Sequence, residues 1–458
     1  MVLSVSEAFF QNPRIISFPE PALDFFKQGG ENIQSPIAGL QEYGPYDNNA
    51  GIRNFSRIEL IICCPDEDSI KTKTEKLCNY LSEGIRYSKG MKTDYSLDEF
   101  EINDQYYYYD LDDQSSLKSS LLALIRENRS RRNQPICVIT VGSDRRGTSD
   151  TEDYYTTKKI LISNGFSSQY ISTQNSLNDI IQRRNEFVLR NIANNIYTKL
   201  GGIPWTLKYQ ERTKDQQLVM GYAFGRVKYR GSKKYVPCAV SFFNQYGQWL
   251  GIYTTTIDNP VIPRHSKGMV LTYDQAANLL EEALEKYATL RNFHNLKSLN
   301  IYRLGNYGRE ECKAFHESQL PSSCDELGLV SVSTKSSIRG YSPKNKHGHP
   351  SRGTGILFSE TSSLLFTTGN AVVDGKEKNH TVGCPSPVVV QDCGKDPSSD
   401  KIEKIMNQTF DLTSLHWQDL WRSQFRLPCV LSYAQKAAQL LANGVHVNNL
   451  LEEKPWFL

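Results

Sequence analysis

Residues 151–205 read TEDYYTTKKILISNGFSSQYISTQNSLNDIIQRRNEFVLRNIANNIYTKLGGIPW, and this stretch decides how the chain folds. Thr151 is suited to cap a helix, because its hydroxyl can accept a hydrogen bond from an unpaired amide of the first turn. On the helix predicted from there, Tyr155 and Lys159 stand four residues apart and therefore share one face. An aromatic ring and an ammonium group on one face could bind a nucleotide, because the ring can stack on the base and the ammonium group can bind the phosphate.

The second half of the stretch predicts a turn, a short strand and a long helix. Gly165 follows the first helix, and residues 169–171 have the composition of a short strand. Apolar residues then recur near helical spacing over residues 177–199. The glycines at 201–202 are expected to end this helix, since glycine commonly follows a helix C-terminus.

Four side chains of the stretch have the chemistry to bind a phosphorylated nucleotide end: Tyr155, Lys159, Gln169 and Lys199. They offer a stacking ring, two cations and one amide. The alternative is that both helices lie on the surface and carry ordinary exposed lysines, because such pairs are common on solvated faces. The pattern alone leaves both interpretations open.

Together with the KLGGIPW motif of residues 199–205, these four residues resemble the 5′-phosphate pocket in the MID domain of Argonaute proteins. The likeness is greatest to the short prokaryotic and archaeal Argonautes that consist only of MID and PIWI domains. The YGPY motif of residues 43–46 and the terminal PWFL of residues 455–458 agree with it. The resemblance therefore spans nearly the whole chain, and it implies an α/β fold with a Rossmann-like MID domain and a ribonuclease-H-like PIWI domain.

The hydrophobic pattern independently predicts the first of these domains. Apolar runs at residues 58–62 and 136–141 indicate buried strands, and a helix is expected between them at 68–83. Strands that alternate with helices indicate a parallel sheet of Rossmann type. A G-x-G-x-x-G fingerprint is absent after the second strand, which argues against an enzyme that binds a nicotinamide or flavin. We place the MID domain at 57–205 and regard residues 1–56 as an irregular segment that packs on the other domains.

Residues 206–458 predict a second domain with a different order of elements. Strands are expected at 218–224, 235–243 and 249–253, followed by an amphipathic helix at 273–290 and a strand at 299–303. Antiparallel hairpins followed by a strand and helices suit a ribonuclease-H-like fold. Pattern and resemblance therefore agree on a PIWI domain.

Length and composition are those of a protein with two or three folded domains. The chain has 458 residues and a formal charge of only +3, so binding to nucleic acid has to come from local patches.

The start of the chain does not resemble a signal peptide, and no run approaches the length of a membrane span. The ten cysteines show no zinc-finger spacing and are expected to be reduced. We expect a cytoplasmic protein, and the resemblance implies a prokaryotic one.

Two groups of cations are candidates for contact with a nucleic-acid backbone. Residues 335–352 contain no acidic residue, and their glycine and proline content predicts a loop that could track phosphates. A mobile surface insertion is the alternative. The candidate contacts, which include two cations after the first predicted PIWI strand, are Arg226, Lys228, Lys335, Arg339, Lys344 and Lys346.

Ribonuclease-H-type cleavage needs carboxylates that converge on two divalent ions. At the positions where catalytic PIWI domains carry their ligands, the resemblance places Ala223, Leu304 and Gln435. Alanine and leucine cannot bind a metal, and glutamine is a poor substitute for a carboxylate. The chain is therefore expected to have no catalytic residues. The alternative is an active guide-directed endonuclease with non-standard metal ligands taken from nearby acids, namely Asp258, Glu310 and Glu311.

The resemblance also implies a function and a set of partners. Short Argonautes bind a 5′-phosphorylated guide, most commonly RNA, and pair it with a complementary target, most commonly DNA. A magnesium or manganese ion is implied at the guide phosphate, with the C-terminal carboxylate of Leu458 as a ligand. The relatives act with a separate protein that joins a PAZ-like segment to a TIR, sirtuin-like, nuclease or membrane effector. The implied role is guided defence against plasmids or phage.

Overall fold

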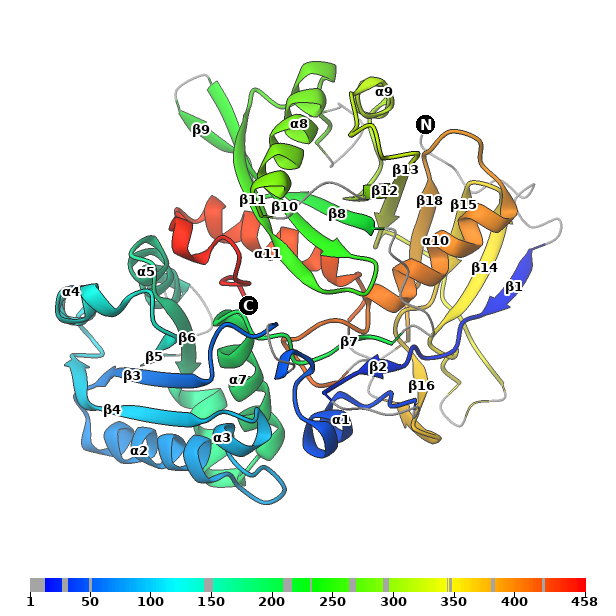
Figure 1. Cartoon of the computed structure of the whole chain (residues 1–458). Helices are drawn as coiled ribbons and strands as arrows, with labels where there is room; N and C mark the ends of the chain where they lie inside the picture. Colours follow the sequence, from blue (N-terminus) through cyan, green and yellow to red (C-terminus); the bar gives the residue numbers. More distant parts are fainter. Residues whose placement is uncertain are drawn as a thin grey trace.

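The computed structural model of the chain describes residues 13–26, 32–48, 52–143, 151–208, 216–230, 233–262, 269–290, 296–343, 345, 348–379, 384–421 and 425–458. The described elements build two main sheets, which belong to two lobes that lie side by side (Figure 1). We call these the small sheet and the large sheet.

The small sheet has four parallel strands in the order β4-β3-β5-β6. These are β3 (Arg57–Pro65), β4 (Glu99–Tyr109), β5 (Ile136–Gly142) and β6 (Ser167–Ser172). The helices around them are α2 (Asp68–Glu83), α3 (Met91–Asp94), α4 (Gln114–Asn128), α5 (Thr151–Ser163), α6 (Asn178–Arg183) and α7 (Glu186–Lys199).

Both faces of the small sheet are covered, as a Rossmann-like arrangement requires. Side chains alternate along a strand, so neighbouring residues of β3 enter different cores. Leu60 and Ile62 belong to the core that contains α2 and α7, whereas Ile61 and Cys63 pack with α4 and α5. This explains why β3 reads as a continuous apolar run instead of an alternating one.

The helix predicted over residues 177–199 is interrupted, so this prediction is wrong at one point. The first part, α6, ends where Arg184 takes the left-handed conformation with φ of 49°. Asn185 then begins α7, because its side-chain oxygen accepts hydrogen bonds from the amides of Phe187 and Val188. An asparagine that caps a new helix competes with continuation of the previous one.

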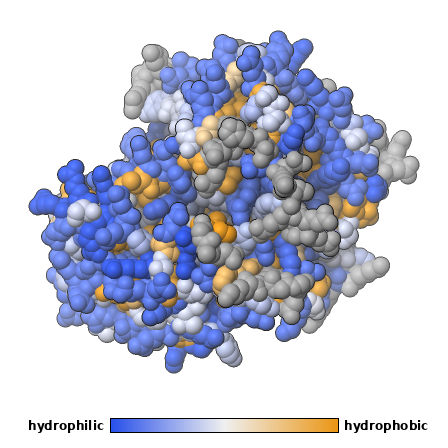
Figure 2. Space-filling model, in the orientation of Figure 1, coloured by the Kyte–Doolittle hydropathy of each residue, from blue (hydrophilic) through white to orange (hydrophobic). Residues whose placement is uncertain are grey.

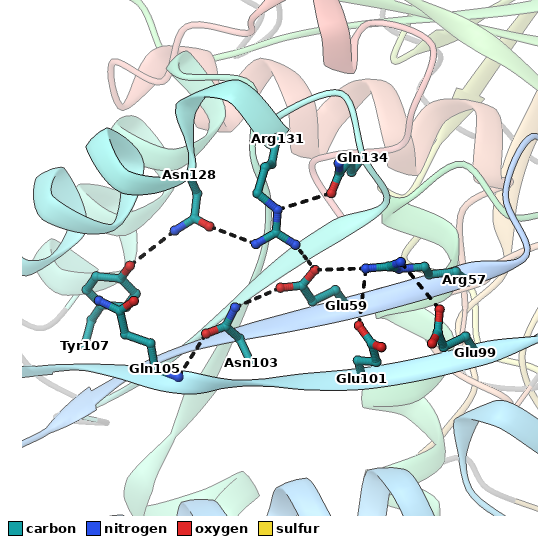
Figure 3. A network of polar contacts seen from close by, with 10 residues as sticks. All are labelled: Arg57, Glu59, Glu99, Glu101, Asn103, Gln105, Tyr107, Asn128, Arg131 and Gln134. Atoms are coloured by element: carbon teal, nitrogen blue, oxygen red, sulfur yellow. Dashed lines mark hydrogen bonds and ion pairs between the residues drawn. The ribbon is translucent and has the colours of Figure 1, made fainter.

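Strand β4 lies at the edge of the small sheet and carries a bulge that a polar network fixes (Figure 3). Between Leu60 and Ile62 of β3 the pairing advances by four residues on β4. Asn103 of the bulge donates to Glu59 at 2.9 Å, and Arg131 forms an ion pair with the same carboxylate. A cavity of about 620 Å³ opens beside this network. Such a bulge hinders pairing of the edge with another sheet.

The large sheet has ten strands in the order β1-β14-β15-β18-β13-β12-β8-β10-β11, with β9 paired to β10. Strand β12 pairs in parallel with β8 and with β13, and the other pairs of this sheet are antiparallel. The strands are β1 (Arg14–Ser17), β8 (Gln216–Phe224), β9 (Lys228–Arg230), β10 (Lys233–Asn244), β11 (Trp249–Asp258), β12 (Leu296–Leu304), β13 (Glu326–Ser333), β14 (Thr354–Ser359), β15 (Ser362–Leu365) and β18 (Val388–Asp392). A mixed sheet in which antiparallel hairpins come first along the chain is the arrangement predicted for a ribonuclease-H-like domain.

Helices cover this sheet on both faces. One core contains side chains of α8 (Tyr273–Leu290) and α9 (Arg309–Glu317), and the other contains those of α10 (Ser399–Leu412) and α11 (Cys429–Ala442). A separate hairpin is formed by β16 (Asn370–Val373) and β17 (Lys376–Asn379). Within the described residues, no helix has both the length and the apolar character to cross a bilayer.

The described part of the N-terminal segment is more regular than expected. Strand β1 extends the large sheet beside β14, and β2 (Leu23–Asp24) pairs with β7 (Thr206–Leu207). Ser35 caps α1 (Pro36–Tyr43). Asp47 is buried and accepts hydrogen bonds from the Tyr197 hydroxyl and from the Ile203 amide. The described part of the segment therefore packs on the large sheet at one end and beside α7 at the other.

Candidate nucleic-acid interface

Two buried lysines stand together where α5, β6 and the end of α7 meet. Lys158 is 1% exposed and Lys199 is 2% exposed. Lys158 Nζ donates to the backbone oxygen of Ser168 at 2.9 Å, and Lys199 Nζ donates to Gln169 Oε1. We call Lys158, Lys199 and Gln169 the lysine pocket.

The electrostatics of the lysine pocket are set by the burial of two basic side chains side by side. Burial lowers the pKa of Lys158 to about 8. Burial also lowers the pKa of Lys199 well below its usual range, and the neighbouring charge of Lys158 adds to this effect. Within the described residues, neither lysine forms an ion pair with a carboxylate. Buried cations are normally paired, so this pair calls for a negative ligand.

The structure brings together two of the four predicted pocket residues, Gln169 and Lys199. Lys159 is exposed, and its Nζ lies 3.8 Å from the position that a Cβ on Gly444 would occupy. A tyrosine beside the buried amines is Tyr154, because Lys158 Nζ lies 5.7 Å from its ring centroid. Roles for Tyr155 and Lys159 in binding phosphate stay predictions.

Sequence reasoning missed Tyr154 and Lys158 because both residue types occur in doublets. The pairs 154/158 and 155/159 have the same spacing of four residues, so each pair shares a helix face. Only the rotation of α5 against the sheet decides which pair points inward. The Tyr155 ring instead packs edge-on against Tyr154, with 5.2 Å between centroids.

The C-terminal tail reaches the junction between the two lobes (Figure 1). Trp456 is fully buried and Phe457 is 2% exposed. The Phe457 ring centroid lies 5.5 Å from that of Trp249 on β11. Lys454 Cγ lies 3.7 Å from the position of a Cβ on Gly201, directly after α7. The tail therefore contacts both the large sheet and the segment that carries Lys199.

The groups at this junction could supply only some of the ligands that a divalent ion needs. Among the described residues, no group of three histidine, cysteine, aspartate or glutamate side chains is placed to hold a metal. The carboxylate of Leu458 would thus be the main protein ligand. Magnesium is commonly bound by one or two carboxylates together with phosphate oxygens and water. The donor set fits an ion that arrives with a phosphate, and Leu458 as its ligand stays a prediction.

The position of Ala223 on β8 lies directly beneath helix α11. Ala223 is 3% exposed, and the glycines two residues before and after it approach the helix closely. A Cβ on Gly221 would stand 2.5 Å from the Val430 oxygen, and one on Gly225 would stand 2.4 Å from the Ala438 oxygen. Helix α11 therefore packs closely on β8 on either side of Ala223.

The other two positions expected to replace catalytic ligands lie on β12 and α11. Leu304 is half-buried at the end of β12, and Gln435 is exposed on α11. Of the alternative acids, Glu311 is fully buried and already accepts hydrogen bonds from the Tyr222 hydroxyl at 2.6 Å and from Arg303 Nε at 3.0 Å. Asp258 and Glu310 are exposed.

The predicted backbone-binding cations fall into three groups. Arg226, Lys335 and Arg339 are exposed and Lys228 is half-buried, so they are accessible to a ligand. Arg339 is partly engaged, because its Nη1 donates to the backbone oxygens of Ser336 and Ile338 and to Ser386 Oγ. Lys344 and Lys346 lie outside the described residues.

Arg352, at the end of the basic stretch, is a core residue and not a surface cation. It is 4% exposed, forms an ion pair with Glu20, and lies 4.5 Å from the centroid of the Phe410 ring. An arginine buried in this way stabilises packing and is not available to phosphates. The exposed cations of the basic stretch therefore do not include Arg352.

Comparison with known proteins agrees with this geometry. The family model of the Piwi domain matches residues 146–446, which is well over half of the chain. No curated protein matches the sequence. A Rossmann-like lobe and a ribonuclease-H-like lobe with a lysine pocket at their junction define a protein of the Argonaute fold. The chain belongs to the Piwi family, and the predicted fold class is confirmed.

Three solved structures show the extent of the likeness. An Argonaute from Clostridium butyricum, bound to a guide DNA and a 19-mer target DNA, matches 97% of this chain with a TM-score of 0.70 and 19% identity. Drosophila Piwi matches 97% with a TM-score of 0.61 and 15% identity, and A. aeolicus Argonaute matches 94% with a TM-score of 0.60 and 17% identity. The matches cover 55%, 56% and 54% of those chains, so this chain spans about half of their length.

Proposed function

We propose that this protein is a short Argonaute that binds the 5′-phosphorylated end of a guide RNA and uses it to recognise complementary DNA. The observation that carries the proposal is the lysine pocket, in which two buried lysines and one amide lie together and, within the described residues, no carboxylate forms an ion pair with either lysine. A terminal phosphate would supply the missing negative charge. Hydrogen bonds from charged groups to an anion are also stronger than neutral ones.

The surroundings of the pocket suit a nucleic-acid strand. On the face shown in Figure 2, hydrophilic residues predominate and apolar residues form small separate groups, which suits a charged polymer. Exposed cations at Arg226, Lys335 and Arg339 extend from the large-sheet lobe. Phosphate contacts of this kind provide affinity that does not depend on sequence.

The experiment that tests the pocket compares two adjacent lysines of α5. We expect Lys158→Ala to weaken binding of a 5′-phosphorylated guide tenfold or more, since a hydrogen bond to a charged group contributes about 1.5–3 kcal/mol. Lys159→Ala tests the assignment made from sequence, and a larger loss there than in Lys158→Ala would favour that assignment. Lys118→Ala, an exposed lysine on α4, serves as the inert control. Equal affinity of the wild type for 5′-phosphorylated and 5′-hydroxyl guides would refute the proposal.

We further propose that the protein does not cleave its target. Support comes from the close approach of α11 to β8 around Ala223 and from the structural role of Glu311. An active endonuclease would need at least two carboxylates near each other at the end of β8 and β12. The described residues supply none at positions 223 and 304.

The destructive step would then belong to a partner protein, as the resemblance to short Argonautes implies. We propose that a PAZ-like segment fused to a TIR, sirtuin-like, nuclease or membrane effector binds this chain and is activated in defence when guide and target pair. Co-expression with the product of the adjacent gene tests this. We expect a stable complex whose effector activity appears only with a matched guide and target, and activity that is independent of the target would contradict it.

A further inference from the structure

Two arginines from different parts of the large-sheet lobe meet at one hydroxyl group. Arg339 lies in the loop after β13, and Arg426 lies shortly before α11. Arg339 Nη1 donates to Ser386 Oγ at 3.1 Å, and Arg426 Nη2 donates to the same oxygen at 2.7 Å. We call Arg339, Arg426 and Ser386 the arginine site.

The three segments that form the arginine site carry no acidic residue. Residues 334–359, 384–391 and 425–451 include neither aspartate nor glutamate. Within the described residues, no carboxylate forms an ion pair with Arg339 or Arg426. Two like charges that meet at a neutral hydroxyl repel each other, and a bound anion would offset this repulsion.

Part of Arg426 has a structural role, and the remainder of the site is open to a ligand. Arg426 Nε donates to the Ser386 backbone oxygen at 3.0 Å, and Nη2 donates to the backbone oxygens of Thr334 and Pro387 at 2.7 Å each. Within the described residues, the bonds of Arg426 start from Nε and Nη2, and those of Arg339 start from Nη1. Arg339 is exposed and Arg426 is half-buried, so their other N–H groups can donate to a ligand.

An exposed aromatic ring stands beside the arginine site. Tyr341 is 79% exposed and follows Arg339 by two residues. Its ring packs against Gly348, because a Cβ there would stand 2.4 Å from Tyr341 Cε2. Cys384 Sγ donates to the Gly340 backbone oxygen at 3.8 Å, so this loop runs along the segment that carries the hydroxyl of the site. The ring is therefore supported by its own loop and still accessible.

We propose that the arginine site binds an internal phosphate of a single-stranded nucleic acid and that Tyr341 stacks on a neighbouring base. The proposal rests on the proposed function and adds to it a contact that does not need a 5′-phosphate. The planar fork of an arginine matches the geometry of a phosphate. Cations that bind the backbone and an aromatic ring that stacks on bases are the usual parts of a surface for single strands.

A strand with a 5′-hydroxyl tests the arginine site separately from the lysine pocket. Ser386→Asp places a carboxylate between the two arginines, so the variant should keep its unfolding temperature and lose the anion site. We expect its affinity, measured by fluorescence anisotropy, to fall about tenfold or more, and by the same factor for 5′-hydroxyl and 5′-phosphorylated strands. Ser119→Asp adds the same charge at an exposed position of α4 and should leave both affinities unchanged.

The outcomes of this test separate the two proposals. Unchanged affinity of Ser386→Asp for both strands would overturn the arginine site. Equal affinity of the wild type for the two strands would instead overturn the proposed function. Ser386→Asn changes the size of the side chain without adding charge, so it should weaken binding less than Ser386→Asp. An equal loss in both variants would show that shape and not charge matters, and the anion site would be wrong.

Two further variants keep the proposal testable if Ser386→Asp does not fold. Arg339→Gln should lower the slope of log affinity against log salt by about 0.7, because one phosphate contact is lost. Tyr341→Ala should weaken binding about fivefold or more, but only for a strand that carries bases. An equal loss with a strand of the same length that lacks bases would overturn the stacking. If Arg339→Gln keeps its affinity for nucleic acid and loses only a complex with an effector protein, the site binds an acidic protein and the proposal is wrong.

Discussion

Gly221 lies so close to helix α11 that a Cβ there would stand 2.5 Å from the backbone oxygen of Val430. The contact is reinforced by Ser241, whose hydroxyl donates to the same oxygen at 2.6 Å. Helix α11 therefore rests directly on the backbone of β8. Ala223, which is 3% exposed, lies two residues further along the same strand.

The first prediction concerns this packing. Gly221→Ala should destabilise the protein by about 1–3 kcal/mol, because the added methyl group forces α11 away from β8. Thermal or denaturant unfolding measures the change. Gln435→Ala is the control, since the exposed side chain of Gln435 can be shortened without altering the contact. Wild-type stability of Gly221→Ala would show that α11 readily moves to accommodate a side chain on β8.

The second prediction is that guide and target both stay intact in the presence of magnesium or manganese. Restoring aspartates with Ala223→Asp and Leu304→Asp together should not produce cleavage, because the remaining ligands and their supporting contacts are also required. Ala223→Asp should also lower stability, since it would bury a carboxylate without a partner. Gel analysis of labelled strands tests the first part. Guide-dependent cuts by the unmodified protein would show an active nuclease.

Sequence reasoning recovered most of the fold because the elements are buried runs with clear limits. Helix α2 has the predicted limits of 68–83, and α8 has those of 273–290. The break at Arg184 was missed because the apolar residues keep their helical spacing across it. A single asparagine, Asn185, caps a new helix there all the same.

The candidate site was recovered less completely, for a reason that is geometric. Adjacent residues of a helix point about 100° apart, so the sequence KK does not reveal which lysine faces inward. Packing of α5 on the sheet buries Lys158 and exposes Lys159. Arg352 likewise reads as a surface cation until its pairing with Glu20, which is distant in sequence, is seen.

The third prediction concerns the salt dependence of guide binding. Replacing Arg226, Lys228 and Lys335 by glutamine should reduce the slope of log affinity against log salt by about 2–3 units, because each phosphate contact contributes about 0.7–0.9. Titrations at several salt concentrations measure the slope. The exposed Arg129 and Arg132 are suitable controls, since they lie at the end of α4 in the small-sheet lobe. An unchanged slope in the triple variant would mean that the three cations do not contact nucleic acid.

The last prediction concerns the C-terminal carboxylate, and it separates a metal ligand from a structural plug. Deleting residues 456–458 should destabilise the protein in either case, because Trp456 and Phe457 are buried at the junction of the two lobes. Deletion therefore cannot decide between the two roles.

Adding a few polar residues after Leu458 moves the carboxylate but leaves the buried aromatic rings in place. If the carboxylate binds a divalent ion at the guide phosphate, the extended protein should keep its unfolding temperature and lose the magnesium-dependent part of its affinity for 5′-phosphorylated guides. Its affinity in the presence of a chelator should match that of the wild type. Equal magnesium dependence with and without the extension would eliminate the carboxylate as a ligand and leave the tail with a structural role only.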